Sequence, residues 1–134
     1  MSIKLDSDTI SVMNVFSDVT SIPARDSFVE DDKVIFVVSQ GQAGIAIGKN
    51  GVKIKMLQEM LKKEVIVIEY SDDPVKLFEN VIHPNKLLSG YVANDQDGSR
   101  KLDVYVDAKP SRSRVKLVKS VMQRYFNITN VNIR

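Results

Sequence analysis

The two halves of this 134-residue chain carry similar successions of apolar segments. The run 33–38, rich in β-branched residues, resembles the run 101–106, and each is followed by a stretch with helical periodicity. The apolar positions of the two helical stretches match: Ile54, Leu57, Met60 and Leu61 in the first, Val115, Val118, Val121 and Met122 in the second. An internal repeat of this kind constrains the chain to two small units of about 65 residues each.

The predicted fold class is α+β, with small mixed sheets covered by helices. The first half is expected to run α-β-β-α-α-β: a helix from Ser7 to about Asp18, strands at 25–29 and 33–39, two helices hinged at 48–51, and a strand at 65–68 buried on both faces. The second half is expected to contain strands at 87–93, 102–106 and 128–133 and a basic helix at about 111–126.

A further short helix is predicted between the two halves. Asp72-Asp73-Pro74 is a typical helix start, with acidic caps followed by proline at the first helical position. His83-Pro84 ends this helix, which we interpret as a connector. The predicted divisions are therefore a first domain at 1–71, a connecting helix at 72–84 and a second domain at 85–134.

A glycine-bracketed loop lies between the two predicted helices of the first half. Gly48 and Gly51 flank Lys49 and Asn50. Glycine has no Cβ, so another backbone can approach closely, and a lysine beside a helix N-terminus suits a phosphate. The pattern predicts a clamp on a nucleic-acid backbone, and a purely structural helix–helix turn is the alternative. It is not a nucleotide-binding P-loop, because three residues rather than four separate Gly44 from Gly48, and no hydroxyl follows the lysine.

The residues around this loop supply the candidate contacts. Glycines allow close approach, Lys49 offers charge and Asn50 a neutral donor or acceptor, while nearby lysines reach adjacent phosphates and isoleucines line a groove for bases. Core packing is the alternative for the isoleucines, above all for Ile54. The predicted nucleic-acid-binding residues are Gly48, Lys49, Asn50, Gly51, Lys53, Lys55, Ile45 and Ile47.

Basic charge is concentrated in two segments although the net charge is only +2. Residues 41–63 hold five basic and one acidic side chain, and residues 108–134 hold seven basic and none acidic. This concentration favours a localised polyanion site, with a solvated helix face as the alternative for the second segment. The predicted auxiliary contacts there are Lys109, Arg112, Arg114, Lys116 and Lys119. Four aromatic residues are candidates for base stacking, but their periodicity favours the core: Tyr91, Tyr105, Tyr125 and Phe126.

The composition argues against catalysis and against a membrane protein. The chain has no cysteine and one histidine, His83, so we expect no enzyme activity, no metal and no cofactor. The longest purely apolar run, 34–38, is far shorter than the roughly 20 residues of a membrane helix, and no secretory leader opens the chain. We expect a cytoplasmic monomer.

The stretch Ile47-Gly-Lys-Asn-Gly-Val-Lys-Ile54, placed between two helices, after two strands and before a third, resembles a type II KH domain. KH domains clamp about four unpaired nucleotides on this loop. The tandem arrangement resembles the KH pair of NusA-like transcription factors. The segments 69–74, with Phe78 and Pro84, and 124–126 are similar to archaeal members.

This resemblance implies binding of single-stranded RNA, a nascent transcript or rRNA, during termination, antitermination or elongation, with RNA polymerase as a candidate partner. From a length of 134 residues we expect neither the polymerase-binding N-terminal domain nor the S1 domain of bacterial NusA. Two alternatives remain open: a protein-interaction scaffold for polymerase or ribosomal components, and a KH-type ribosome-assembly factor.

The second half departs from the KH pattern. Nine residues separate Val38 from Gly48, but only two separate Val106 from Lys109, which the helical match aligns with Gly48. The second copy is therefore predicted to be degenerate, without the glycine loop and without the helix that precedes it.

Overall fold

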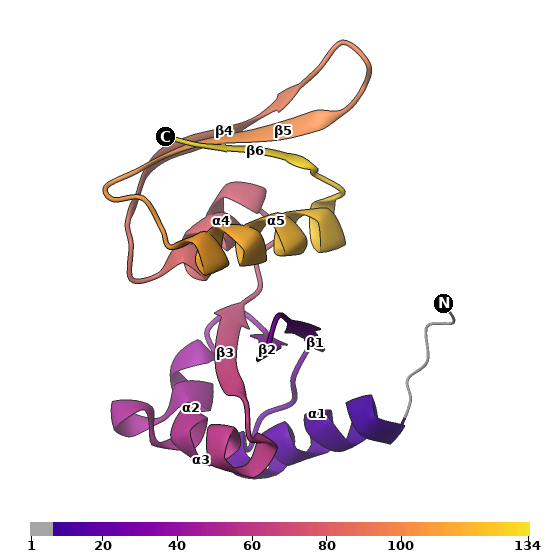
Figure 1. Ribbon diagram of the computed structural model, residues 1–134, viewed down its shortest axis with the longest axis vertical. Coiled ribbons are helices and arrows are strands. Elements are labelled where there is room, and N and C mark those ends of the chain that lie inside the picture. Colours follow the sequence, from indigo (N-terminus) through magenta and orange to yellow (C-terminus); the bar gives the residue numbers. More distant parts are fainter. Residues whose placement is uncertain (1–6) are drawn as a thin grey trace. The chain divides into compact units, whose positions relative to one another are not determined.

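The computed structural model describes residues 7–134, and side chains from residue 11 onward. The chain divides after Tyr70 into two compact units, which Figure 1 shows as ribbons. Unit 1 ends at Tyr70 and unit 2 begins at Ser71.

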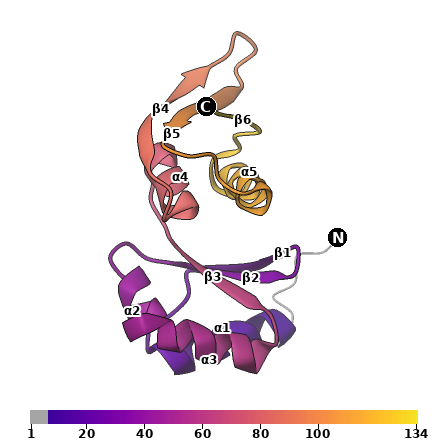
Figure 2. The same cartoon turned by 60° about the vertical axis from the view of Figure 1, so that its left-hand side comes forward.

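Unit 1 has the predicted order α-β-β-α-α-β. Its elements are α1 (Ser7–Thr20), β1 (Asp26–Glu30), β2 (Lys33–Val38), α2 (Ala43–Ile47), the single 3-10 turn η1 (Lys49–Gly51), α3 (Val52–Leu61) and β3 (Glu64–Glu69). The sheet has the order β1-β2-β3, in which β1 is antiparallel and β3 parallel to the central strand β2. The three α-helices lie on one face of this sheet (Figure 2).

The core of unit 1 forms where β2 meets these helices. Alternate residues of β2, among them Val34 and Phe36, belong to one buried cluster with Leu57 of α3. The ring of Phe16 from α1 stacks on Phe36 with ring centroids 4.4 Å apart. All of 34–38 is buried, as expected of a central strand.

The prediction that β3 is buried on both faces is only partly correct. Val65 and Ile68 are buried, but Ile66 and Val67 between them are partly exposed. The physical reason is the position of β3 at the edge of the sheet, where one side of the strand has no neighbouring strand within the sheet.

Unit 2 repeats the sheet of unit 1. Its elements are α4 (Pro74–Ile82), β4 (Leu87–Asn94), β5 (Arg100–Val106), α5 (Arg112–Phe126) and β6 (Asn130–Ile133). The sheet order is β4-β5-β6, again with an antiparallel pair followed by a parallel pair. Figures 1 and 2 both show α4 and α5 on one face of this sheet. The predicted architecture of two tandem type II KH-like units, the second degenerate, is confirmed.

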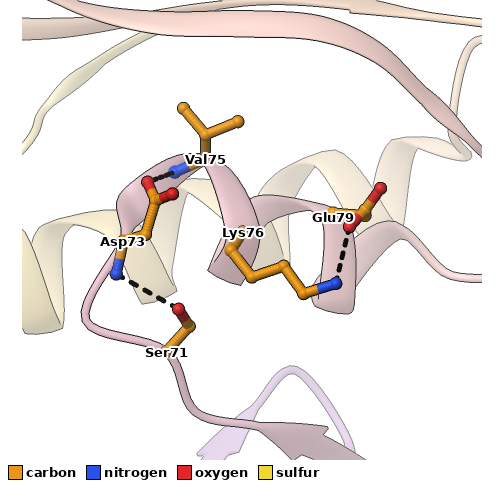
Figure 3. A network of polar contacts seen from close by, with 5 residues as sticks. All are labelled: Ser71, Asp73, Val75, Lys76 and Glu79. Carbon is orange, nitrogen blue, oxygen red and sulfur yellow. Dashed lines mark hydrogen bonds and ion pairs between the residues drawn. The ribbon is translucent and has the colours of Figure 1, made fainter.

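The helix predicted as a connector within 72–84 belongs instead to unit 2. Its start is capped as predicted: Asp73 accepts a hydrogen bond from the Val75 amide at 3.0 Å, and the Ser71 hydroxyl accepts one from the Asp73 amide (Figure 3). Lys76 pairs with Glu79 at 2.9 Å. Four apolar side chains of α4 are buried, because the helix packs on α5 and β4: Leu77, Phe78, Val81 and Ile82. In unit 2, α4 therefore precedes the sheet as α1 does in unit 1.

The predicted loss in the second copy is confirmed. Only residues 107–111 separate β5 from α5, whereas residues 39–51 separate β2 from α3. Among the described residues, unit 2 has no element that corresponds to α2 or η1.

Tyr91 and Tyr105 are 55% and 41% exposed, so their assignment to the core is wrong. Tyr91 of β4 lies opposite Asp103 of β5 in the ladder. Tyr105 is two residues after Asp103 on β5, so the three side chains share one face of the sheet. The neighbours Leu102 and Val104 point to the other face, which the helices cover. Strand alternation was correctly read, but both tyrosines are exposed on the face away from the helices, where only Asp103 beside them is buried, at 3% exposure.

Candidate nucleic-acid interface

The loop between α2 and α3 begins with a glycine that no other residue can replace without strain. Gly48 has φ 78° and ψ 170°, a backbone region almost restricted to glycine. Its amide donates a hydrogen bond to the Gly44 carbonyl at 3.0 Å, which closes the end of α2. A Cβ at Gly48 would lie 2.9 Å from Cγ of Lys53, so packing beneath the loop also requires glycine here.

The tip of the loop turns outward. Asn50 and Gly51 both have left-handed backbone angles, at φ 58° and 71°, and the Gly51 amide donates to the Gly48 carbonyl at 3.1 Å. A Cβ at Gly51 would meet nothing within 4 Å, so this glycine faces open space. Lys49 and Asn50 are exposed at the tip. The loop thus presents a cation, an amide and an uncovered stretch of backbone to solvent.

The N-terminus of α3 follows directly behind this tip. Gly51 is its N-cap and supplies no side-chain hydrogen bond, and the first turn carries no acidic residue. The N-terminal end of a helix bears partial positive charge and attracts anions. This end of α3 therefore adds to the positive charge of Lys49.

The side chains next to the loop differ in what they can reach. Lys55 is exposed and Ile45 is 51% exposed, whereas Ile47 is half-buried. Ile54 packs against the core, as its alternative assignment predicted. Lys53, which was predicted to reach a phosphate, instead has its ammonium hydrogen-bonded to the carbonyls of Ile45 and Thr20.

Sequence reasoning missed an apolar strip on the outer side of α3. Val52, Met56 and Met60 are all about half exposed and follow one another at intervals of four residues, which places them on one side of the helix. Met60, one of the apolar positions that match the second half, is 57% exposed. The four-residue spacing of Val52, Met56 and Met60 could have predicted this strip from the sequence. It was overlooked because the apolar positions that include Leu57 already account for an apolar side of the helix.

The predicted auxiliary residues lie at the start and along the outer side of α5, in unit 2. Arg112, Lys116 and Lys119 are exposed and occur at helical spacing, which places them on one face of α5. Lys109 is exposed ahead of the helix, and Arg114 is half-buried. These cations form a basic face on a regular helix, not a loop that encloses a ligand.

The described residues offer no sign of a metal site or a membrane segment. Nowhere among them do three or more histidine, aspartate or glutamate side chains gather in a way that could hold a metal ion. None of the described helices combines the length and apolar character needed to cross a bilayer.

Comparison with known proteins places this geometry in a family. The probable transcription termination protein NusA of Methanococcus vannielii is 33% identical over 114 residues, which are 85% of this chain and 64% of that protein. The protein of the same name from Methanocaldococcus jannaschii is 35% identical over 85 residues, 46% of its length. The chain thus spans less than two thirds of these two relatives. The relative from Halobacterium salinarum is 23% identical and is matched over 99% of both chains.

The fold agrees with a solved relative. The crystal structure of APE1850 matches with a TM-score of 0.79 and 30% identity, over 93% of this chain and 96% of that one. The resemblance to archaeal NusA-like proteins is confirmed by these matches. Residues 11–107 match the family model of the KH domain, and the chain therefore belongs to the KH domain family.

Proposed function

We propose that this protein binds single-stranded RNA on the loop of residues 48–51 and acts in transcription without catalysing a reaction. The observation that carries the proposal is the outward tip of this loop, where exposed Lys49 and Asn50 precede a glycine that faces open space. A KH loop of this kind clamps the backbone of about four unpaired nucleotides.

In this proposal the loop contacts the sugar–phosphate backbone of the RNA, and the neighbouring isoleucines of α2 contact the bases. Phosphates lie against Gly48 and Gly51, with the charge of Lys49 and the N-terminus of α3 opposite them. Lys55, one turn into α3, neutralises a neighbouring phosphate. Unstacked bases rest on Ile45, which is 51% exposed beside the loop, and Ile47, half-buried on another side of α2, adds less.

The basic face of α5 provides a second, weaker contact. Its charges lie on a helix without a glycine loop, so it attracts phosphates without reading bases. Arg112 and Lys119 carry this contact, and Lys109, Arg114 and Lys116 add to it. Binding to this face therefore depends on salt and not on RNA sequence.

The role in transcription comes from the relatives, which are named as probable transcription termination proteins. We propose a cytoplasmic monomer that holds a nascent transcript during termination, antitermination or elongation, with RNA polymerase as a partner. A ribosome-assembly factor that holds rRNA is the second candidate, since the same loop serves either RNA.

The test compares native protein with the double variant Lys49→Asp, Asn50→Asp, using a mixed-sequence single-stranded RNA oligonucleotide. Aspartate tolerates the left-handed backbone at residue 50, so the loop keeps its shape. We expect affinity to fall by at least about tenfold, because two acidic groups replace a cation and an amide at a phosphate site.

The matched control is Lys86→Asp, Asn94→Asp, which makes the same charge change on exposed positions of unit 2. The control should lose much less affinity than the loop variant. Equal losses in the two variants, or unchanged affinity in the loop variant, would contradict the clamp and favour a protein-interaction scaffold.

A further inference from the structure

Lys53 lies in the first turn of α3, but its ammonium turns back toward two other helices. Nζ donates to the Ile45 carbonyl of α2 at 3.0 Å and to the Thr20 carbonyl at the end of α1 at 3.4 Å. Carbonyls in the last turn of a helix carry partial negative charge and lack partners within the helix. One ammonium therefore donates to one last-turn carbonyl in each of two helices and joins both to the start of a third.

The stem of the same side chain supports the loop from below. An added Cβ at Gly48 would lie 2.9 Å from Cγ and 3.2 Å from Cδ of Lys53, so the backbone of Gly48 rests on this stem. Gly48 in turn accepts the hydrogen bond from the Gly51 amide. Lys53 therefore contacts the loop at Gly48, to which Gly51 is hydrogen-bonded, and Val52 Cγ1 lies 3.2 Å from the same added Cβ.

We propose that Lys53 is a positioning residue that holds the loop of residues 48–51 in its binding conformation and makes no phosphate contact of its own. This inference rests on the proposed function of the loop. Lys55 is the natural comparison, because it lies on the same helix two residues later and its side chain is exposed. The two lysines are thus expected to contribute to RNA binding in different ways.

The salt dependence of binding separates the two roles. Each phosphate neutralised on a single strand contributes about 0.7 to the slope of log affinity against log salt. Lys55→Met should reduce the slope by about this amount. Lys53→Met, which keeps an unbranched stem in a good helix former, should weaken binding of a mixed-sequence RNA oligonucleotide while the slope stays native. A slope reduced by about 0.7 in Lys53→Met would overturn the proposal.

Amide hydrogen exchange tests, without RNA, whether Lys53 holds the loop of residues 48–51 in place. The Gly48 amide donates to the Gly44 carbonyl of α2 at 3.0 Å, and the Gly51 amide donates to the Gly48 carbonyl at 3.1 Å. Lys53→Met should speed their exchange by about tenfold, because the charge-assisted hydrogen bonds beneath them are lost. Amides of the β2–β3 ladder should keep their native rates, as should both glycines in Lys55→Met.

The outcomes are distinguishable. If Lys53→Met leaves the exchange rates of the Gly48 and Gly51 amides unchanged, or raises exchange rates equally throughout unit 1, Lys53 is not a positioning residue for the loop. A native protein that binds no RNA would refute the proposed function. The exchange measurement would still show whether Lys53 holds the loop.

Discussion

Units 1 and 2 share a framework and differ in one insertion. In each unit a helix precedes two antiparallel strands, and a second helix leads to a third strand parallel to the middle one. Unit 1 adds α2 and η1 between β2 and α3. Since unit 2 completes its sheet and core without this insertion, the framework does not need the loop.

The two equivalent helices, α3 and α5, differ in the residue that caps their N-terminus. In α5 the Ser111 hydroxyl accepts a hydrogen bond from the Arg114 amide at 3.2 Å. In α3 the equivalent place is taken by Gly51, which has no side chain to cap the helix. A glycine N-cap is less favourable than a serine N-cap by only a few tenths of a kcal/mol, roughly, so the open backbone at Gly51 costs unit 1 little stability. The two equivalent helices thus begin with different caps, a serine in unit 2 and a glycine in unit 1.

Gly48→Ala should have the largest effect on this comparison. Its backbone angles and the close Lys53 stem both oppose a Cβ, so unit 1 should lose about 3 kcal/mol of unfolding free energy. Hydrogen exchange of β2 amides measures this loss. The matched change in unit 2, Lys109→Ala, should alter stability by less than about 0.5 kcal/mol because the side chain is exposed. Similar effects at both positions would remove the distinction between the units.

Val121→Ala and Met60→Ala test where the two helices stop being equivalent. The sequence match pairs these positions, yet Val121 is fully buried and Met60 is 57% exposed. Val121→Ala should destabilise unit 2 by about 2 kcal/mol, through lost burial and a small cavity. Met60→Ala should change unit 1 by less than about 0.5 kcal/mol. Denaturant unfolding followed by exchange in each unit gives both values, and equal losses would refute the burial difference.

Ser111→Ala tests the cap that unit 1 lacks. Without the hydroxyl, the Arg114 amide loses its partner, and unit 2 should be destabilised by about 1 kcal/mol. Ser113→Ala is the comparison, because its hydroxyl contacts Ser111 Oγ at 3.4 Å without capping the helix, and it should cost less stability than Ser111→Ala. If both variants have the same stability as the native protein, the caps do not distinguish the units.

The smallest effect concerns the strand-connecting turn of unit 2. The Asp97 carboxylate accepts hydrogen bonds from the Ser99 hydroxyl and from the Ser99 amide. Both bonds lower the pKa of Asp97 from 3.8, and the hydroxyl has the larger effect. A lowered pKa means that the charged form stabilises the folded turn above pH 3.8, and that this contribution disappears as the pH falls through the folded-state pKa. NMR titration of Asp97 should give a midpoint below 3.8, and Ser99→Ala should raise it. A midpoint unchanged by Ser99→Ala would contradict this cause.

Local sequence determined the elements and the loop. Periodicities of two and 3.6 residues identified the strands and helices, because one face of each must be apolar to be buried. The glycine pair at 48 and 51 identified the loop, since the backbone angles of Gly48 are almost restricted to glycine. Counting residues between Val38 and Gly48, and between Val106 and Lys109, showed that the second copy lacks a helix, because a chain too short cannot form one.

Tertiary structure alone decided which surfaces meet. An apolar stripe on α4 does not say which sheet the helix covers, so the sequence suggested a connector where the structure has a helix of unit 2. Alternation in β4 and β5 does not say which face of the sheet stays exposed, so Tyr91 and Tyr105 were wrongly assigned to the core. Lys53 shows the same limit, because one of its acceptors lies 33 residues earlier, at Thr20. Contacts between segments distant in sequence depend on packing of the whole unit, and no local pattern encodes them.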